Sequence, residues 1–171
     1  MKKIDNYIPP GFEFKYEKRI FIWGIVLSLL YGSFFFRRFY YTWDNLFETV
    51  WKNGEFVKLG VKEGAVMKDF VELFDNASLG FFIVAIYMVL FVFLHYAYFK
   101  QESKSIYLMK RLPNKWELHK RCIMIPFIEI GICFIVAFLF LLLCYSVYMV
   151  VTPAECIVGN QWQKIWEIWL R

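Results

Sequence analysis

The chain has 171 residues, of which 60% are hydrophobic, 22% aromatic and 20% charged. Its hydrophobic share is too high, and its charged share too low, for an ordinary soluble domain. The same composition excludes a disordered chain, a collagen-like chain and a small disulfide scaffold. The class that remains is an integral membrane protein, provided that the apolar residues form long blocks.

Three blocks meet that condition: residues 20–36, 79–99 and 122–151. A helix needs roughly 20 residues to cross the hydrocarbon core of a bilayer. The third block is longer than that and contains Pro126, which is placed to kink the helix or to lie in its first turn. The first block is followed by two arginines rather than by small residues, so an uncleaved helix is favoured over a signal peptide. The sequence therefore predicts an all-α membrane protein with three transmembrane helices.

The charges of the connecting segments predict the orientation of these helices. Basic residues outnumber acids in residues 1–19 and, above all, in residues 100–121, but not in residues 37–78 or 152–171. Because basic loops stay in the cytoplasm, we expect the amino terminus and the 100–121 loop inside a bacterial cell membrane, and the carboxy terminus outside. The net charge of +5 then reflects topology, with membrane lipids and not nucleic acid as neighbours.

The external segment 37–78 has apolar residues at three- and four-residue spacings in two stretches. One stretch includes Trp43 and Trp51 and ends before Gly54, and the other follows Gly64. This spacing predicts two amphipathic helices that form an external helical hairpin on the membrane surface. Two roles are open for it: a gate for a substrate, or interfacial packing alone.

The tail 152–171 is predicted to form an external interfacial helix. Its residues Trp162, Trp166 and Trp169 fall on one helical face, and tryptophan prefers the membrane–water interface. Together with Trp43 and Trp51, these side chains are predicted interfacial anchors. Contact with a partner subunit or an exported molecule is the alternative role for the tail.

Few residues suggest a catalytic or metal-binding role. The four cysteines, Cys122, Cys133, Cys144 and Cys156, lack the clustered spacing of a metal site, and no catalytic set or phosphate loop is visible. We therefore expect neither a metal, nor a cofactor, nor an enzyme activity in this chain. Glu129 is a candidate functional acid, because an acid within a span usually faces protein or water. It could pair with a basic group on a neighbouring helix or line a path.

The 100–121 loop gives the strongest signal. A short helix can run from Ser103 to Leu112, Pro113 and Asn114 interrupt it, and a new helix can start at Trp116 and enter the third span. This pattern predicts a helix–break–helix elbow along the cytoplasmic surface.

The residues from Ser103 to His119, SKSIYLMKRLPNKWELH, resemble a stretch in small three-helix membrane proteins of Firmicutes. The loop also resembles the one between helices two and three of type-two ABC export permeases. In those permeases this loop forms a coupling helix that docks on the ATPase subunit. The resemblance implies that the docking residues here are Glu102, Leu108, Met109, Lys110, Arg111, Leu112, Pro113, Trp116 and Glu117.

The resemblance implies a function as the membrane-spanning permease subunit of a bacterial ABC exporter. A separate cytosolic ATPase subunit would bind and hydrolyse ATP. Because three helices are half of a usual permease, a second copy or another permease subunit would complete the path. The alternative is a non-transport membrane adaptor or regulatory subunit that anchors a cytosolic partner.

Overall fold

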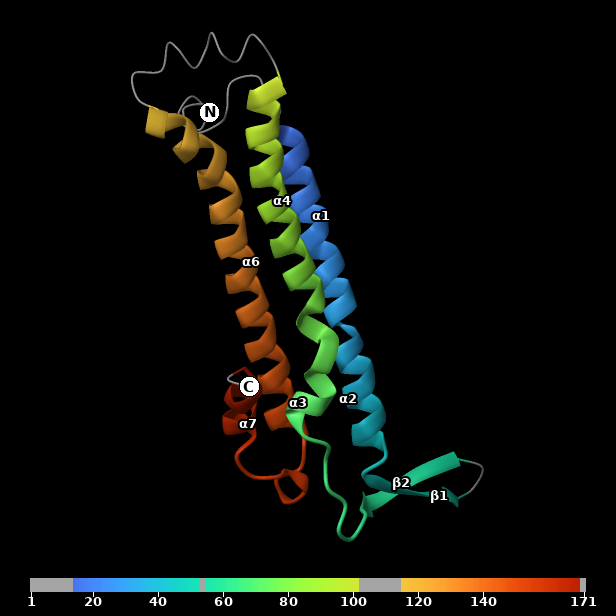
Figure 1. Ribbon diagram of the computed structural model, residues 1–171. Helices are drawn as coiled ribbons and strands as arrows, with labels where there is room; N and C mark the ends of the chain where they lie inside the picture. Colours follow the sequence, from blue (N-terminus) through green and yellow to red (C-terminus); the bar gives the residue numbers. More distant parts are fainter. Residues whose placement is uncertain (1–13, 53–54, 102–114, 170–171) are drawn as a thin grey trace. The chain divides into compact units, whose positions relative to one another are not determined.

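The computed structural model describes residues 14–52, 55–101 and 115–169, and these residues are mostly helical (Figure 1). The elements in chain order are α1 (Phe14–Gly32), α2 (Phe34–Asp44), β1 (Phe47–Lys52), β2 (Glu55–Val61), α3 (Phe70–Phe74), a 3₁₀ turn (Asp75–Ser78), α4 (Leu79–Gln101), α6 (Lys115–Val151), a 3₁₀ turn (Ala154–Cys156) and α7 (Gln161–Trp169).

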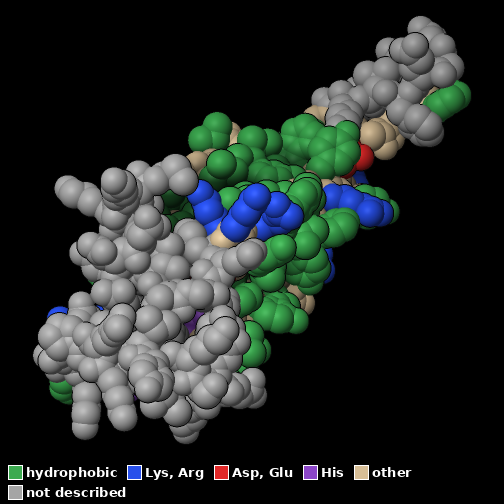
Figure 2. Space-filling view, turned by 90° about the horizontal axis from the view of Figure 1, so that it is seen from above, with side chains coloured by type: hydrophobic (Ala, Val, Ile, Leu, Met, Phe, Trp, Pro, Cys, Tyr) green, Lys and Arg blue, Asp and Glu red, His purple; other side chains and the backbone are tan. Residues whose placement is uncertain are grey.

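The prediction of three helical segments long and apolar enough to cross a membrane is confirmed. They are Lys15–Asp44, Phe70–Ala97 and Cys122–Val151, with mean hydropathies of 1.7, 2.6 and 2.9. Only 22% of the most apolar stretch of each segment is buried within the chain, so most of its apolar side chains need an apolar environment outside it. Hydrophobic side chains cover most of the described surface in the space-filling view (Figure 2). These features support a multi-pass membrane protein.

The chain divides into two compact units. The helical unit contains residues 1–29 and 79–138, and thus most of α1, all of α4 and the first part of α6. The aromatic unit contains residues 30–78 and 139–171, with α2, the two strands, α3, the end of α6 and α7.

In the helical unit, each helix buries a stripe of residues spaced by three, four or seven. This repeat keeps one face of each helix toward its neighbours, as in a left-handed bundle. The buried residues are Glu17, Phe21 and Ser28 on α1, Phe81, Val84, Met88 and His95 on α4, and Cys122, Ile125, Pro126, Glu129 and Cys133 on α6.

Small residues let α1 and α4 approach closely. A Cβ atom added to Gly80 would lie 2.9 Å from the Cα atom of Ser28, and one added to Gly24 would lie 2.9 Å from a methyl group of Val84. Such close approach through small side chains is the usual way that membrane helices associate.

The core of the aromatic unit is a group of rings around Phe70. The ring centroids of Phe35 and Tyr148 lie 5.8 and 5.7 Å from that of Phe70, and Phe39 lies 6.1 Å from Tyr148. The Tyr148 hydroxyl donates a hydrogen bond to the Lys68 carbonyl at 3.0 Å. Aromatic packing thus joins α2, α3 and the end of α6.

Polar contacts attach α7 to the start of α3. The backbone N–H of Phe70 donates to Gln161 Oε1 at 2.9 Å, and Gln161 Nε2 donates to Asp69 Oδ1 at 2.9 Å. Lys164 Nζ contacts both oxygens of Asp69 at 2.8 Å. The hydrogen bonds from Lys164 and Gln161 lower the pKa of Asp69 from its ordinary value of 3.8.

The predicted external helical hairpin is wrong in most of its length. The helix that was expected around Trp43 ends at Asp44, and β1 and β2 follow as an antiparallel pair in which Phe47 is opposite Val61. An Asn–Gly pair between two runs rich in β-branched and aromatic residues is a strong hairpin signal, which the helical spacing obscured.

The second expected amphipathic helix is also shorter than predicted. Only Phe70–Phe74 is α-helical in that stretch, and a 3₁₀ turn then joins it to α4. The apolar spacing reflects the burial of Met67, Phe70, Leu73 and Phe74 in the core of the aromatic unit rather than a helix on a membrane surface.

A matched pair of glycines tests the helix packing. Gly80→Ala should destabilise the protein by about 1–3 kcal/mol, because its Cβ overlaps the α1 backbone. Gly131→Ala should be neutral or stabilising by up to about 1 kcal/mol, since nothing lies within 4 Å of the added Cβ and alanine favours a helix. Thermal unfolding in detergent measures both, and equal effects would contradict this packing.

Acidification should weaken the attachment of α7. The pKa of Asp69 is lowered in the folded protein, so its stabilisation is complete above pH 3.8 and is lost as pH falls through the lowered value. The pair is partly exposed, so the effect should be about 1 kcal/mol or less. The difference in Tm between the wild type and Asp69→Asn should shrink over that acidic range. A constant difference would show that the ionised carboxylate does not stabilise α7.

Candidate functional site

The site begins with Pro126, which lies buried within α6. Proline has no backbone N–H, so the carbonyl of Cys122, four residues earlier, lacks its α-helical donor. His95 Nδ1 on α4 lies 3.1 Å from that carbonyl oxygen. A carbonyl can only accept, so Nδ1 carries the hydrogen and donates it. The imidazole therefore supplies the hydrogen bond that Pro126 removes, as membrane bundles require.

The other nitrogen of His95 faces Glu17 on α1. His95 Nε2 and Glu17 Oε2 are 3.3 Å apart, and both side chains are 1% exposed. The separation is that of an ion pair, but the carboxylate forms no aligned hydrogen bond with the described residues. His95 thus connects α1 and α6 through its two ring nitrogens.

Glu129 completes a buried group of three ionisable side chains, which we name the acid–histidine cluster (Glu17, His95 and Glu129). Glu129 lies about two helical turns after Cys122, on the same face of α6, and is 6% exposed. Its Oε2 atom has no hydrogen-bond partner in the part of the chain that the structure describes. Glu129 is close enough to Glu17 and His95 to interact electrostatically with both.

A second polar contact joins α4 and α6 close to the cluster in sequence. Its α6 residue, His119, lies just before the bilayer-length segment Cys122–Val151. The Tyr96 hydroxyl and His119 Nδ1 are 2.6 Å apart, joining the end of α4 to the first turns of α6. Two contacts therefore connect α4 and α6 on either side of residues 102–114 in the sequence.

The four cysteines lie in buried positions. Cys122, Cys133 and Cys144 fall on one face of α6 because their spacing is close to three helical turns, and all four cysteines are buried and free. Cys133 Sγ lies 3.3 Å from the Phe81 carbonyl oxygen. Within residues 14–52, 55–101 and 115–169, no group of three or more His, Cys, Asp or Glu side chains is placed to hold a metal ion.

Most of the predicted docking residues, Glu102, Leu108, Met109, Lys110, Arg111, Leu112 and Pro113, lie outside the described residues. Trp116 is exposed at the start of α6, and its ring lies 6.2 Å from that of His119. Glu117 is in α6, but its side chain is outside the description. The role of this segment stays a prediction.

The predicted anchors lie in different environments. Trp43 is half-buried and its Nε1 donates to the Val151 carbonyl at 3.2 Å, whereas Trp51 is exposed on β1. Trp162 and Trp166 are exposed on α7 with ring centroids 5.9 Å apart, and Trp169 ends that helix with a side chain outside the description. Membrane anchoring by these residues stays a prediction.

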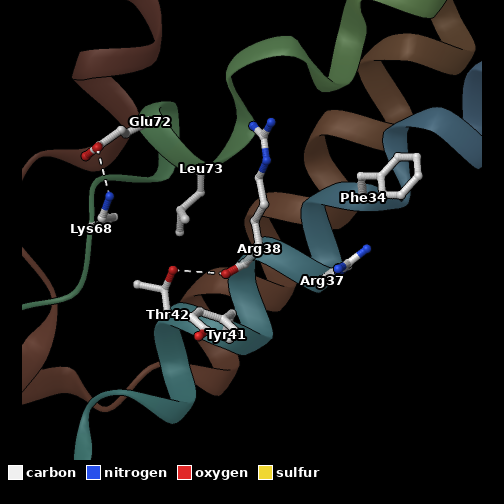
Figure 3. A pocket seen from close by; sticks show the side chains of 8 residues that line it. All are labelled: Phe34, Arg37, Arg38, Tyr41, Thr42, Lys68, Glu72 and Leu73. Atoms are coloured by element: carbon white, nitrogen blue, oxygen red, sulfur yellow. Dashed lines mark hydrogen bonds and ion pairs between the residues drawn. The ribbon is translucent and has the colours of Figure 1, made fainter.

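The aromatic unit contains a second candidate, a groove of about 560 Å³ between α2 and the start of α3 (Figure 3). Lys68 pairs with Glu72 at 3.2 Å, and Arg38 lies 4.0 Å from Asp75. Arg37 also lines the groove. The apolar residues of the lining include Phe34 and Leu73. The groove therefore combines ion-paired charged groups with apolar side chains.

Sequence reasoning identified Glu129 as a candidate functional acid but did not place Glu17 in a helix. Glu17 was assigned to the cytoplasmic amino-terminal segment 1–19, because the charges around it suggested that the helix began at Ile20. In the structure α1 begins at Phe14, so Glu17 lies within the helix and on its buried face. The spacing of four and seven residues from Glu17 to Phe21 and Gly24 could have shown this.

No family model, curated protein or solved structure matches this chain.

A double-mutant cycle tests the bond between His95 and the Cys122 carbonyl. His95→Leu should destabilise the protein by about 1–3 kcal/mol, because it leaves the carbonyl and buried acids without their partner. In a Pro126→Ala background the loss should be smaller, since the introduced alanine supplies the missing helical N–H. Unfolding free energies of the four proteins give the coupling. Equal losses in both backgrounds would show that the carbonyl does not depend on His95.

Proposed function

We propose that this chain is a membrane-spanning subunit of a bacterial ABC exporter that works with a separate cytosolic ATPase. Two features support the proposal: three helices long and apolar enough to cross a membrane, and the resemblance of the 100–121 loop to a permease coupling loop. A second copy of the chain, or another permease subunit, would complete the transport path.

The observation that carries the proposal is the attachment of α4 to α6 beside the segment 102–114. The contacts are His95 Nδ1 to the Cys122 carbonyl and the Tyr96 hydroxyl to His119. An ATPase that moved the intervening segment would therefore move α4 and α6 as a pair. If α4 and α6 were not joined by these contacts, the same movement could displace one helix without the other.

The experiment measures ATP hydrolysis by the ABC ATPase that co-purifies with this chain, reconstituted in proteoliposomes. The chain should stimulate hydrolysis, and Leu112→Asp or Pro113→Ala should abolish most of that stimulation while membrane insertion is normal. Full stimulation with both variants would refute the proposal. Co-purification of a cytosolic partner that is not an ATPase would favour a membrane adaptor instead.

A conservative pair of variants tests the attachment itself. Tyr96→Phe removes one hydroxyl and should lower the stimulation about fivefold, the factor for a hydrogen bond worth about 1 kcal/mol. Tyr87→Phe makes the same change at an exposed position of the same helix and should have no effect. Equal behaviour of the two variants would exclude the hydroxyl contact as part of the coupling.

A further inference from the structure

We propose that Glu17, His95 and Glu129 form a proton-binding site within the helical unit, and that release of its proton loosens α1 from α4 and α6. The inference rests on the burial of the three side chains, on the contacts of His95 with the Cys122 carbonyl and Glu17, and on the position of Glu129 on the same face of α6 as Cys122. It does not depend on an ATPase partner.

The first step concerns the proton between His95 and Glu17. His95 Nδ1 already donates its hydrogen to the Cys122 carbonyl, so a neutral imidazole would present the lone pair of Nε2 to Glu17. Lone pairs on nitrogen and on an ionised carboxylate, 3.3 Å apart in a buried site, would repel each other. One proton must therefore be shared by the two groups. With that proton, the pair has no net charge whichever group carries it.

The second step concerns Glu129. Because the Glu17–His95 pair is neutral, an ionised Glu129 would be a buried charge without compensation. Among the described residues, the ionisable groups that interact with it are Glu17 from α1 and His95 from α4. No described Lys or Arg side chain is buried. An uncompensated carboxylate is strongly disfavoured in such surroundings, so Glu129 carries a proton in the packed bundle.

The third step concerns what happens when Glu129 releases this proton to water. The cluster then has a net charge of −1, with Glu17 and Glu129 as competing acids around one imidazole. Water entry or separation of the helices would relieve that charge. Glu17, the cluster member on α1, lies at ion-pair distance from His95 on α4, but no aligned hydrogen bond joins the two side chains. α1 is therefore the helix that loosens. Only a proton moves, and no covalent bond other than the O–H bond changes.

The first experiment is infrared spectroscopy of the full chain in lipid nanodiscs across a pH titration. The wild type should show a protonated-carboxyl band at neutral pH that disappears at alkaline pH. Glu129→Gln should remove this band, and Glu72→Gln, at an exposed acid, should leave it unchanged. Absence of the band in the wild type at neutral pH overturns the proposal without any variant. Loss of the band in Glu17→Gln but not in Glu129→Gln would overturn it as well.

The second experiment measures the loosening of α1. Amide hydrogen exchange of α1 is compared between the wild type and Glu129→Gln at each pH, so that the intrinsic effect of pH cancels. The wild type should exchange faster than the variant only above the pH at which the carboxyl band disappears. Identical exchange in both proteins at every pH would show that the proton is not coupled to helix packing.

Discussion

The hydrogen bond from His95 Nδ1 to the Cys122 carbonyl is the interaction on which the helical unit depends. It exists because Pro126 removes a helical donor, and in an apolar environment the freed carbonyl needs another one. The bond fixes the imidazole tautomer, and the tautomer decides what Nε2 presents to Glu17. A single proline thereby determines which nitrogen of His95 donates to the Cys122 carbonyl and which one faces Glu17.

The two units are stabilised by different physics. In the helical unit, small residues such as Gly80 bring backbones together, and a few buried polar groups join the helices. In the aromatic unit, rings around Phe70 form the core, and Gln161 and Asp69 satisfy the polar groups at its edge. Dispersion between close backbones and packing between large rings are both effective without a hydrophobic drive from water.

Burial of ionisable groups distinguishes the acid–histidine cluster from the groove between α2 and α3. The groove between α2 and α3 is open, and its Lys68 is paired with Glu72. Ions there are hydrated and cost little to hold. In the cluster, which is buried, charges of the same kind are costly, and this cost is the physical basis for the proposed link between protonation and helix packing. The cluster is therefore the place where a small chemical change can move helices.

The sequence by itself determined the three bilayer-length helical segments and marked Glu129, because apolar block length and an acid within a block are local properties. The sequence-based prediction was wrong at the β-hairpin, because the helical spacing of apolar residues was given more weight than the turn signal at Gly54. It was also wrong at Glu17, which was assigned to the segment before the first helix because charged residues surround it. Only the tertiary structure decided that Glu17, His95 and Glu129 are buried on facing sides of three helices and interact electrostatically. This arrangement depends on the register of three helices, which is set by close packing between residues far apart in the chain.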